Sequence, residues 1–207
     1  MKANWLAVAV AGVLLGACSS PTKNLVASHI DSATPERFTY CSGYGCSQEW
    51  IMVLTPQEWQ QATAVFDPAA ETAEEERQRM AQAIAIIEQI TGKKAGTEND
   101  KPGAAILVLD SKGQLDCIDE SHNTMLYLTF FEREGLLRFH TVGEPAHRGD
   151  VINRWFHNTA TVVEEETGQG YVIDTWFGAN GEPADITTVE VWLEGWEPEH
   201  FKTRPDR

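Results

Sequence analysis

A run of apolar side chains near the middle of the chain is the feature that most constrains the fold. Residues 125–131 are Met-Leu-Tyr-Leu-Thr-Phe-Phe, and a helix built from them is apolar on nearly every side. A helix without a polar face is stable only when other elements surround it. We therefore predict a central, buried helix that ends near Gly135, with the rest of the chain arranged around it.

The segments after this helix favour strands. Residues 136–142, 154–163 and 170–177 are rich in β-branched and aromatic side chains, and residues 186–193 favour a final strand. The polar stretch 164–170 contains two glycines and predicts a hairpin turn between the second and third of these strands. Consecutive antiparallel strands after a buried helix indicate an α+β fold with a sheet of about four strands.

Two helices are predicted before the buried one. Thr55 precedes Pro56, which is the order of a helix cap followed by proline at the first helical position. Asp67-Pro68 starts a second, longer helix whose early acidic run, residues 74–76, is expected to face solvent. Gly92 is the predicted end of that helix, and the polar segment 91–103 is expected to be a loop.

The N-terminus indicates export. After Lys2 comes an uncharged, mostly apolar stretch to Ala17, which is too short to stay in a bilayer and is typical of a signal peptide. The sequence Leu15-Gly16-Ala17-Cys18-Ser19 resembles the lipobox of bacterial lipoproteins. The resemblance implies that Cys18 becomes a lipidated N-terminus and, with Ser19 after it, that the protein is sorted to the outer membrane, facing the periplasm.

Composition then sets the domain organisation. Removal of signal peptide 1–17 leaves 190 of 207 residues, enough for one domain, which we place at residues 37–198. Residues 18–36 are expected to be a flexible tether behind the lipid, and residues 199–207 a polar tail. The remaining 31 acidic side chains far outnumber the basic ones, so nucleic acid is excluded as a partner and the lipid is the expected membrane contact.

Three cysteines remain in the mature chain. Cys41 and Cys46 are separated by Ser-Gly-Tyr-Gly, and the two glycines permit the tight loop of a local disulfide. This pairing leaves Cys117 as an unpaired thiol in an oxidising compartment, which indicates reactivity. The alternatives are an inert, buried Cys117 or a disulfide from Cys117 to one of the other two cysteines.

Cys117 follows a helix-capping pattern. Asp116 is placed to cap the buried helix and Asp119 to bond back to the cap, so Cys117 lies in the first turn. Free backbone amides and the helix dipole there favour a thiolate, whereas the charges of Asp116, Asp119 and Glu120 oppose it. The Cys117 amide and the side chain of Gln114 are candidate donors to an oxyanion.

A base and its orienting group lie downstream of this thiol. The turn at residues 168–170 is roughly midway between His157 and Asp174, so the hairpin brings these two side chains together across adjacent strands. His157 can then take a proton from Cys117, while Asp174 fixes the imidazole tautomer.

The order of a cysteine at the start of a buried helix, a histidine on one strand and an aspartate on the next resembles the catalytic core of the transglutaminase-like superfamily, relatives of papain-fold cysteine peptidases. The resemblance covers about residues 112–178. It implies Cys117 as nucleophile, His157 as base and Asp174 as orienter, acting on a peptide or protein amide without a cofactor or metal. One departure is Thr159, where many members carry an aromatic residue.

Other side chains offer alternatives to this site. His122 is expected to be satisfied polar packing, and His140 or His147 can replace His157 as base. A zinc site from Cys117, His122 and His157 lacks compact ligand spacing. Four tryptophans can line a groove for sugars or peptides, although they are more often core: Trp155, Trp176, Trp192 and Trp196.

Two further functions stay open. Peptidoglycan peptidases of the NlpC/P60 type also combine an Asp-Cys opening with a strand histidine, but Ile118-Asp119 stands here in place of their Ser-Gly. A non-catalytic accessory lipoprotein can keep the same fold as a binding module with an inert Cys117.

Overall fold

The buried helix is the centre of the fold. The computed structural model describes residues 21–104, 112–150 and 154–204, and in it α4 spans Cys117–Arg133. The side chains of Leu126, Tyr127 and Leu128 are fully buried, so every side of the helix contacts protein. The prediction of a central helix ending near Gly135, which adopts a left-handed φ of 70°, is confirmed.

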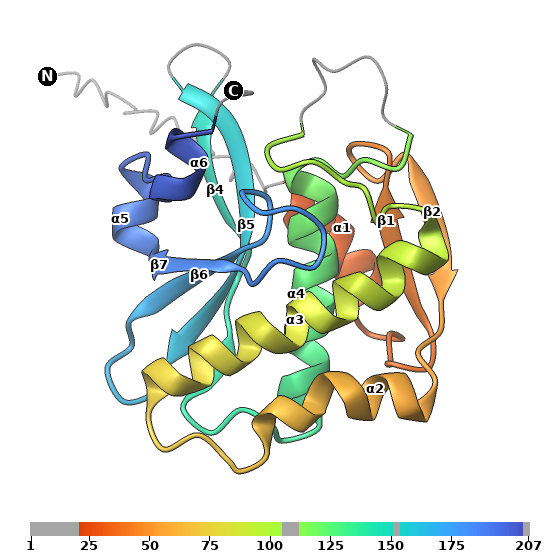
Figure 1. Ribbon diagram of the computed structural model, residues 1–207. Coiled ribbons are helices and arrows are strands. Elements are labelled where there is room, and N and C mark those ends of the chain that lie inside the picture. Colours follow the sequence, from red (N-terminus) through yellow and green to blue (C-terminus); the bar gives the residue numbers. More distant parts are fainter. Residues whose placement is uncertain (1–20, 105–111, 151–153, 205–207) are drawn as a thin grey trace, which may run out of the picture.

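An antiparallel sheet covers one side of α4 (Figure 1). Its strands are β3 (His140–Val142), β4 (Ala146–Asp150), β5 (Arg154–Glu164), β6 (Gly170–Asp174) and β7 (Asp185–Thr188). The order is β3-β5-β6-β7, and β4 pairs with the first half of β5. The α+β class and the β5–β6 hairpin are confirmed, and this sheet has five strands where about four were predicted.

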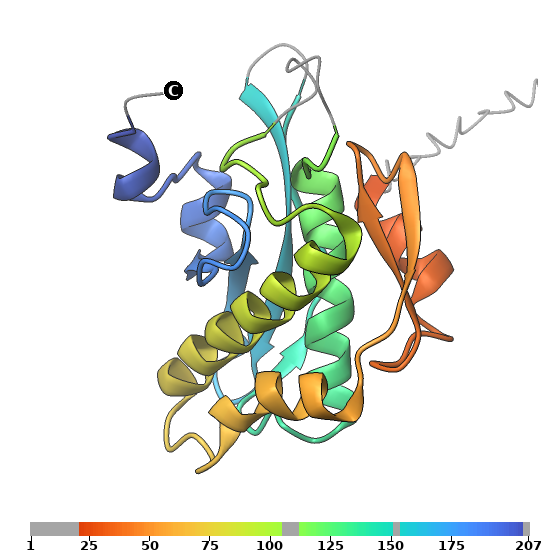
Figure 2. The ribbon, with the colours of Figure 1, turned by 45° about the vertical axis from the view of Figure 1, so that its right-hand side comes forward.

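A two-stranded hairpin covers the opposite side of α4. Figure 2 shows β1 (Phe38–Ser42) and β2 (Gln48–Met52) there, with α1 (Pro21–His29) behind them. The α1 helix packs on α4 through Val26, which is buried. The prediction of a flexible tether is therefore wrong for residues 21–36. The sequence of this segment has only a weak helical pattern, but its apolar contact with the domain orders it.

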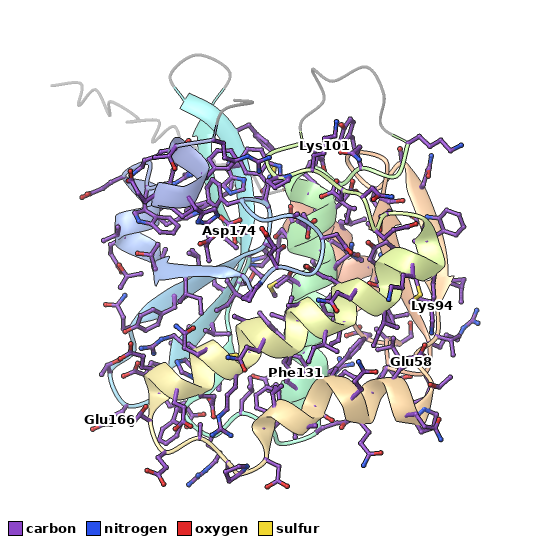
Figure 3. The ribbon with its side chains drawn as sticks, in the orientation of Figure 1. Glu58, Lys94, Lys101, Phe131, Glu166 and Asp174 are labelled. Atoms are coloured by element: carbon purple, nitrogen blue, oxygen red, sulfur yellow. A yellow bond between two sulfur atoms is a disulfide. The ribbon has the colours of Figure 1, made fainter. Side chains whose placement is uncertain are left out.

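Two helices cross the remaining face. α2 (Pro56–Thr63) begins as predicted, with Thr55 as cap, and runs through the short 3₁₀ turn η1 (Ala64–Phe66) toward α3 (Ala73–Ala95). α3 passes diagonally over α4 (Figures 1 and 2). In Figure 3, Lys94 and Glu58 lie close together at one end of α3, where their charged groups are 2.6 Å apart, and Phe131 lies beneath its middle.

The bounds of α3 differ from the prediction at both ends. The helix starts after Thr72, whose hydroxyl accepts a hydrogen bond from the backbone of Glu75, and continues past Gly92 to Gly96. Gly96 has a left-handed φ of 74° and ends the helix, so residues 91–95 are helical and not loop. Gly92 serves packing instead, because a Cβ there would lie 2.6 Å from the Asn180 side chain.

The acidic start of α3 is also not wholly solvated. Glu76 is only 1% exposed, and its carboxylate accepts hydrogen bonds from the backbone of Arg138 and Phe139 and from His140. Burial raises the pKa of Glu76, but these hydrogen bonds outweigh it and lower the pKa overall. The carboxylate therefore ties α3 to the start of β3.

The C-terminal part departs most from expectation. The predicted strand 186–193 stops at Thr188, which caps a short helix, α5 (Val189–Leu193). The polar tail contains α6 (Glu199–Lys202), whose Phe201 is buried. Among the helices of the described ranges, none is long and apolar enough to cross a membrane.

Candidate functional site

Cys117 is the first residue of α4, as the capping pattern predicts. The Asp116 carboxylate accepts hydrogen bonds from the amides of Ile118 and Asp119, both at 3.0 Å, and Asp119 accepts one from the Asp116 amide at 3.2 Å. In this reciprocal cap the Asp116 carboxylate bonds the amides of Ile118 and Asp119. It does not bond the amide of Cys117, the other donor of the first turn.

The Cys41–Cys46 disulfide forms as predicted, and its loop sits on the N-terminus of α4. Asp119 accepts hydrogen bonds from the amides of Tyr44 at 2.8 Å and Cys46 at 2.6 Å. Cys117 is a free, buried thiol, so the alternative disulfides are wrong. The two capping carboxylates therefore fix both the loop and the helix turn that carries the thiol.

His157 and Asp174 come together across β5 and β6. Ala160 lies opposite Ile173, and continuing this register places His157 diagonally across from Asp174 on one face of the sheet. The His157 Nε2 atom lies 2.7 Å from Asp174 Oδ2, and both side chains are buried. Figure 3 shows Asp174 where the sheet approaches α4. The predicted cross-strand pair is therefore present.

Aromatic rings enclose this pair. The imidazole of His157 lies 4.5 Å from the ring of Trp176, 5.2 Å from Phe177 and 5.3 Å from Trp192, centroid to centroid. The indole of Trp192 also donates a hydrogen bond to Asp174 Oδ2 at 2.9 Å. An anionic Asp174 requires the proton of a neutral imidazole to be on Nε2, which leaves a lone pair on Nδ1.

The Nδ1 atom of His157 is buried and has no hydrogen-bond partner among the described residues. The sulfur of Cys117 instead lies 4.0 Å from the carbonyl oxygen of Phe156 and 3.8 Å from Asn158 Nδ2. The thiol thus contacts the residues on both sides of His157 without a hydrogen bond to the imidazole itself. Cys117 also belongs to one buried cluster with Trp176 and Phe177, the two rings that pack on His157.

The thiol is protonated in this arrangement. Burial raises the pKa of Cys117 to about 12, and the charges of Asp116 and Asp174 add to the effect. Hydrogen bonds from Asn158 act in the opposite direction but do not compensate. The predicted competition between the carboxylates and the helix N-terminus is therefore decided in favour of the neutral thiol, chiefly because Cys117 is only 7% exposed.

A group of buried carboxyls lies beside the site. Burial raises the pKa of Asp100 to about 9 and the pKa values of Asp119 and Glu120 to about 7, and repulsion between neighbouring carboxylates adds to each shift. Glu120 accepts a hydrogen bond of 2.7 Å from Thr175, the residue after Asp174. At pH 7 Asp100 is therefore mostly protonated, and Asp119 and Glu120 are about half protonated.

Two side chains at this site are not predicted by any sequence pattern described above. Asn158 donates to the sulfur and Trp192 donates to Asp174. Gln114, the predicted oxyanion donor, directs its amide nitrogen to the carbonyl oxygens of Asn99 and Gly113, both at 3.2 Å. No local pattern singles out Asn158, because its contact with the sulfur joins α4 to β5, two segments far apart in the chain.

The remaining histidines lie elsewhere. His140 bonds Glu76 at the far end of β5, and the exposed His147 packs against Phe156 with tilted rings, 4.7 Å between centroids. His122 is buried polar packing as predicted, 3.0 Å from His29 and not beside Cys117. A zinc site that combines it with Cys117 and His157 is therefore not formed.

Three of the four tryptophans named in the sequence analysis can be placed in the structure. Trp176 and Trp192 pack on His157, and Trp196 lies 6.0 Å from Phe177. The side chain of Trp155 lies outside the described residues. In the described part, these rings bury the candidate site and contribute to the core.

Comparisons with protein-family models, with curated proteins and with solved structures found no match to this chain.

Proposed function

We propose that this protein is a thiol-dependent acyl-transfer enzyme with Cys117 as nucleophile, His157 as base and Asp174 as orienter. The observation that carries the proposal is the 2.7 Å bond from His157 to Asp174, which leaves a buried Nδ1 atom without a hydrogen-bond partner among the described residues. The two neighbours of His157 on β5, Phe156 and Asn158, contact the free sulfur of Cys117 at the N-terminus of α4. A buried imidazole nitrogen without a partner costs stability, and such costs cluster at functional sites.

The proposed reaction begins from the neutral thiol. The Nδ1 atom of His157 takes the proton of Cys117 as the sulfur attacks the carbonyl carbon of an amide, and the imidazolium is stabilised by Asp174. The imidazolium returns the proton to the leaving amine as the carbon–nitrogen bond breaks, which leaves a thioester on Cys117. Water or a second amine then accepts the acyl group and regenerates the thiol.

Two donors are available for the oxyanion. The backbone amide of Cys117 is at the N-terminus of α4, where the helix dipole favours negative charge. The amide group of Asn158, 3.8 Å from the sulfur, is closer to the reacting atoms than Gln114, whose amide nitrogen bonds backbone carbonyls. We therefore assign the second oxyanion contact to Asn158 in this proposal.

The transglutaminase-like resemblance and the lipobox resemblance complete the proposal. The enzyme is a lipoprotein held on the bacterial outer membrane through Cys18, and its substrates are amides of peptides, proteins or peptidoglycan in the periplasm. Acyl carbons buried in hydrocarbon, at about 0.8 kcal/mol per methylene, suffice for such a tether without a spanning helix.

Acylation by a small activated ester tests the chemistry without knowledge of the substrate. Incubation with p-nitrophenyl acetate should place one acetyl group on Cys117, detected by mass spectrometry of the intact protein. His157→Ala should slow this acylation by about a hundredfold or more, because base catalysis is worth that much. His147→Ala is the matched control and should have no effect. Equal acylation rates in both variants would contradict the proposal.

A second candidate function is a non-catalytic binding lipoprotein. The observation that favours it is the neutral, buried thiol with a pKa of about 12. In that case Cys117→Ala changes no activity, and Cys117 is acylated only when the protein unfolds.

Release of peptides from cell-wall fragments that is lost in Cys117→Ser would favour a peptidoglycan peptidase.

A further inference from the structure

A second cluster of reactive side chains lies on the opposite side of α4 from the sheet. The ring nitrogens of His29 and His122 are 3.0 Å apart, and one ligand atom from each of these histidines and the sulfur of Cys41 all lie within 4.8 Å of one another. His122 and Cys41 are fully buried, whereas His29 is partly exposed. The three residues come from α4, β1 and the end of α1, so only the tertiary fold brings them together.

Asn123 fixes the orientation of two of these groups. Its Oδ1 atom accepts a hydrogen bond from the Cys41 amide at 2.9 Å and lies 3.3 Å from His122 Nδ1, while its Nδ2 atom donates to the Cys41 carbonyl at 3.0 Å. Donation from Nδ1 leaves the lone pair of His122 on Nε2, which points at His29. A ligand histidine usually has its second nitrogen held in this way.

The spacing suits a tetrahedral cation. Zinc–nitrogen bonds of about 2.05 Å at the tetrahedral angle place two imidazole nitrogens about 3.3 Å apart, and a zinc–sulfur bond of about 2.3 Å places sulfur about 3.5 Å from each. The observed 3.0 Å between the histidine nitrogens requires an expansion of a few tenths of an ångström. The sulfur of Cys41 lies within 4.8 Å of both nitrogens and has to move inward by up to about 1.3 Å, which release from the disulfide allows. His29 also ends α1, where the carbonyl groups of the helix favour a cation.

The sulfur of Cys41 is a strong ligand only as a thiolate. In the structure it is bonded to Cys46, and a disulfide sulfur carries no charge to donate. Two-electron reduction by a dithiol breaks this bond, gives two protein thiols and oxidises the dithiol to its own disulfide. Loss of the Cys41 proton to solvent on metal binding then supplies the third ligand.

We propose that His29, His122 and Cys41 form a zinc site that is available only when the Cys41–Cys46 disulfide is reduced. Cys46 or water completes the fourth position. The disulfide and the metal are thus alternative partners of one sulfur, and each holds the loop on the N-terminus of α4. This proposal is independent of the acyl-transfer function.

Metal titration of the full chain tests the proposal. Cys18→Ser and Cys117→Ser together leave Cys41 and Cys46 as the only cysteines. Zinc is titrated into reduced and oxidised protein in competition with a chromophoric chelator, and cobalt binding is followed by thiolate-to-cobalt absorption. We expect one zinc per reduced chain, with an affinity at least about a hundredfold above that of the oxidised chain.

Two single variants identify the ligands. His29→Ala changes a partly exposed side chain, so the protein should stay folded, and zinc affinity should fall at least about tenfold. His200→Ala removes a histidine far along the chain and should leave the affinity unchanged. Equal affinity of reduced and oxidised protein, equal losses in the two variants, or cobalt absorption without a thiolate band would each overturn the proposal.

Discussion

We expect Phe201 to help shield the Cys117 thiol from water. It is 7% exposed, belongs to the same buried cluster as Cys117, and lies 4.9 Å from the ring of Phe177 and 5.8 Å from that of Trp176. Because α6 is only four residues long, Phe201→Ala should release it from the site and admit water to the sulfur.

The size of the effect follows from the pKa. An exposed cysteine has a pKa of about 8.5, whereas burial raises that of Cys117 to about 12. At pH 7 the buried sulfur is therefore about 3,000-fold less ionised than an exposed one, and the thiolate is the species that alkylating agents attack. Phe201→Ala should raise the alkylation rate by at least about tenfold, with the full difference in ionisation, about 3,000-fold, as the ceiling.

Iodoacetamide modification followed by mass spectrometry measures this rate, in full-length protein carrying Cys18→Ser. Phe66→Ala is the matched control, because Phe66 is also 7% exposed but packs on Phe131 in the main core. Both substitutions are expected to cost up to about 3–5 kcal/mol of stability. If they accelerate alkylation equally, global unfolding and not the local cover protects the thiol, and the reasoning is refuted.

Three further predictions concern stability. Glu76→Gln should cost about 1–3 kcal/mol in urea unfolding at neutral pH. Because the folded-state pKa of Glu76 is lowered, this loss should shrink as the pH falls below about 4.3; a constant loss would contradict the role of the charge. Gly92→Ala should destabilise by about 1–3 kcal/mol through its contact with Asn180, and Asn180→Ala should relieve the loss. Glu120 has a raised pKa of about 7, so it favours unfolding as the pH rises from about 4 to 7. Glu120→Gln should therefore gain stability relative to the parent over that range, and a pH-independent difference would refute this.

Local sequence patterns correctly predicted the elements that depend only on residues near one another in the chain. The cap at Thr55, the apolar run of α4 and the Asp116–Asp119 cap each depend on residues within one helical turn, and each is present. The end of α3 was misplaced because glycine is ambiguous: Gly92 is there for its small size against Asn180, and only Gly96 has the left-handed backbone of a helix end.

The part of the candidate site that depends on the hairpin and on short loops could be predicted from the sequence. The spacing of His157, the turn and Asp174 indicates a cross-strand pair, and the disulfide follows from the short loop between Cys41 and Cys46. The sequence carried no signal for Asn158 as the neighbour of the sulfur or for Trp192 as a donor to Asp174, since each contact joins segments far apart in the chain.

By itself, the sequence determined the class of the fold, the unpaired cysteine at the head of the central helix and the pairing of imidazole with carboxylate, because periodicity, capping and hairpin spacing act over a few residues. Tertiary structure decided how deeply the thiol is buried, which raises its pKa, and it brought His29, His122 and Cys41 together from three separate elements. Burial and long-range contacts depend on how whole elements pack, and no local pattern encodes them.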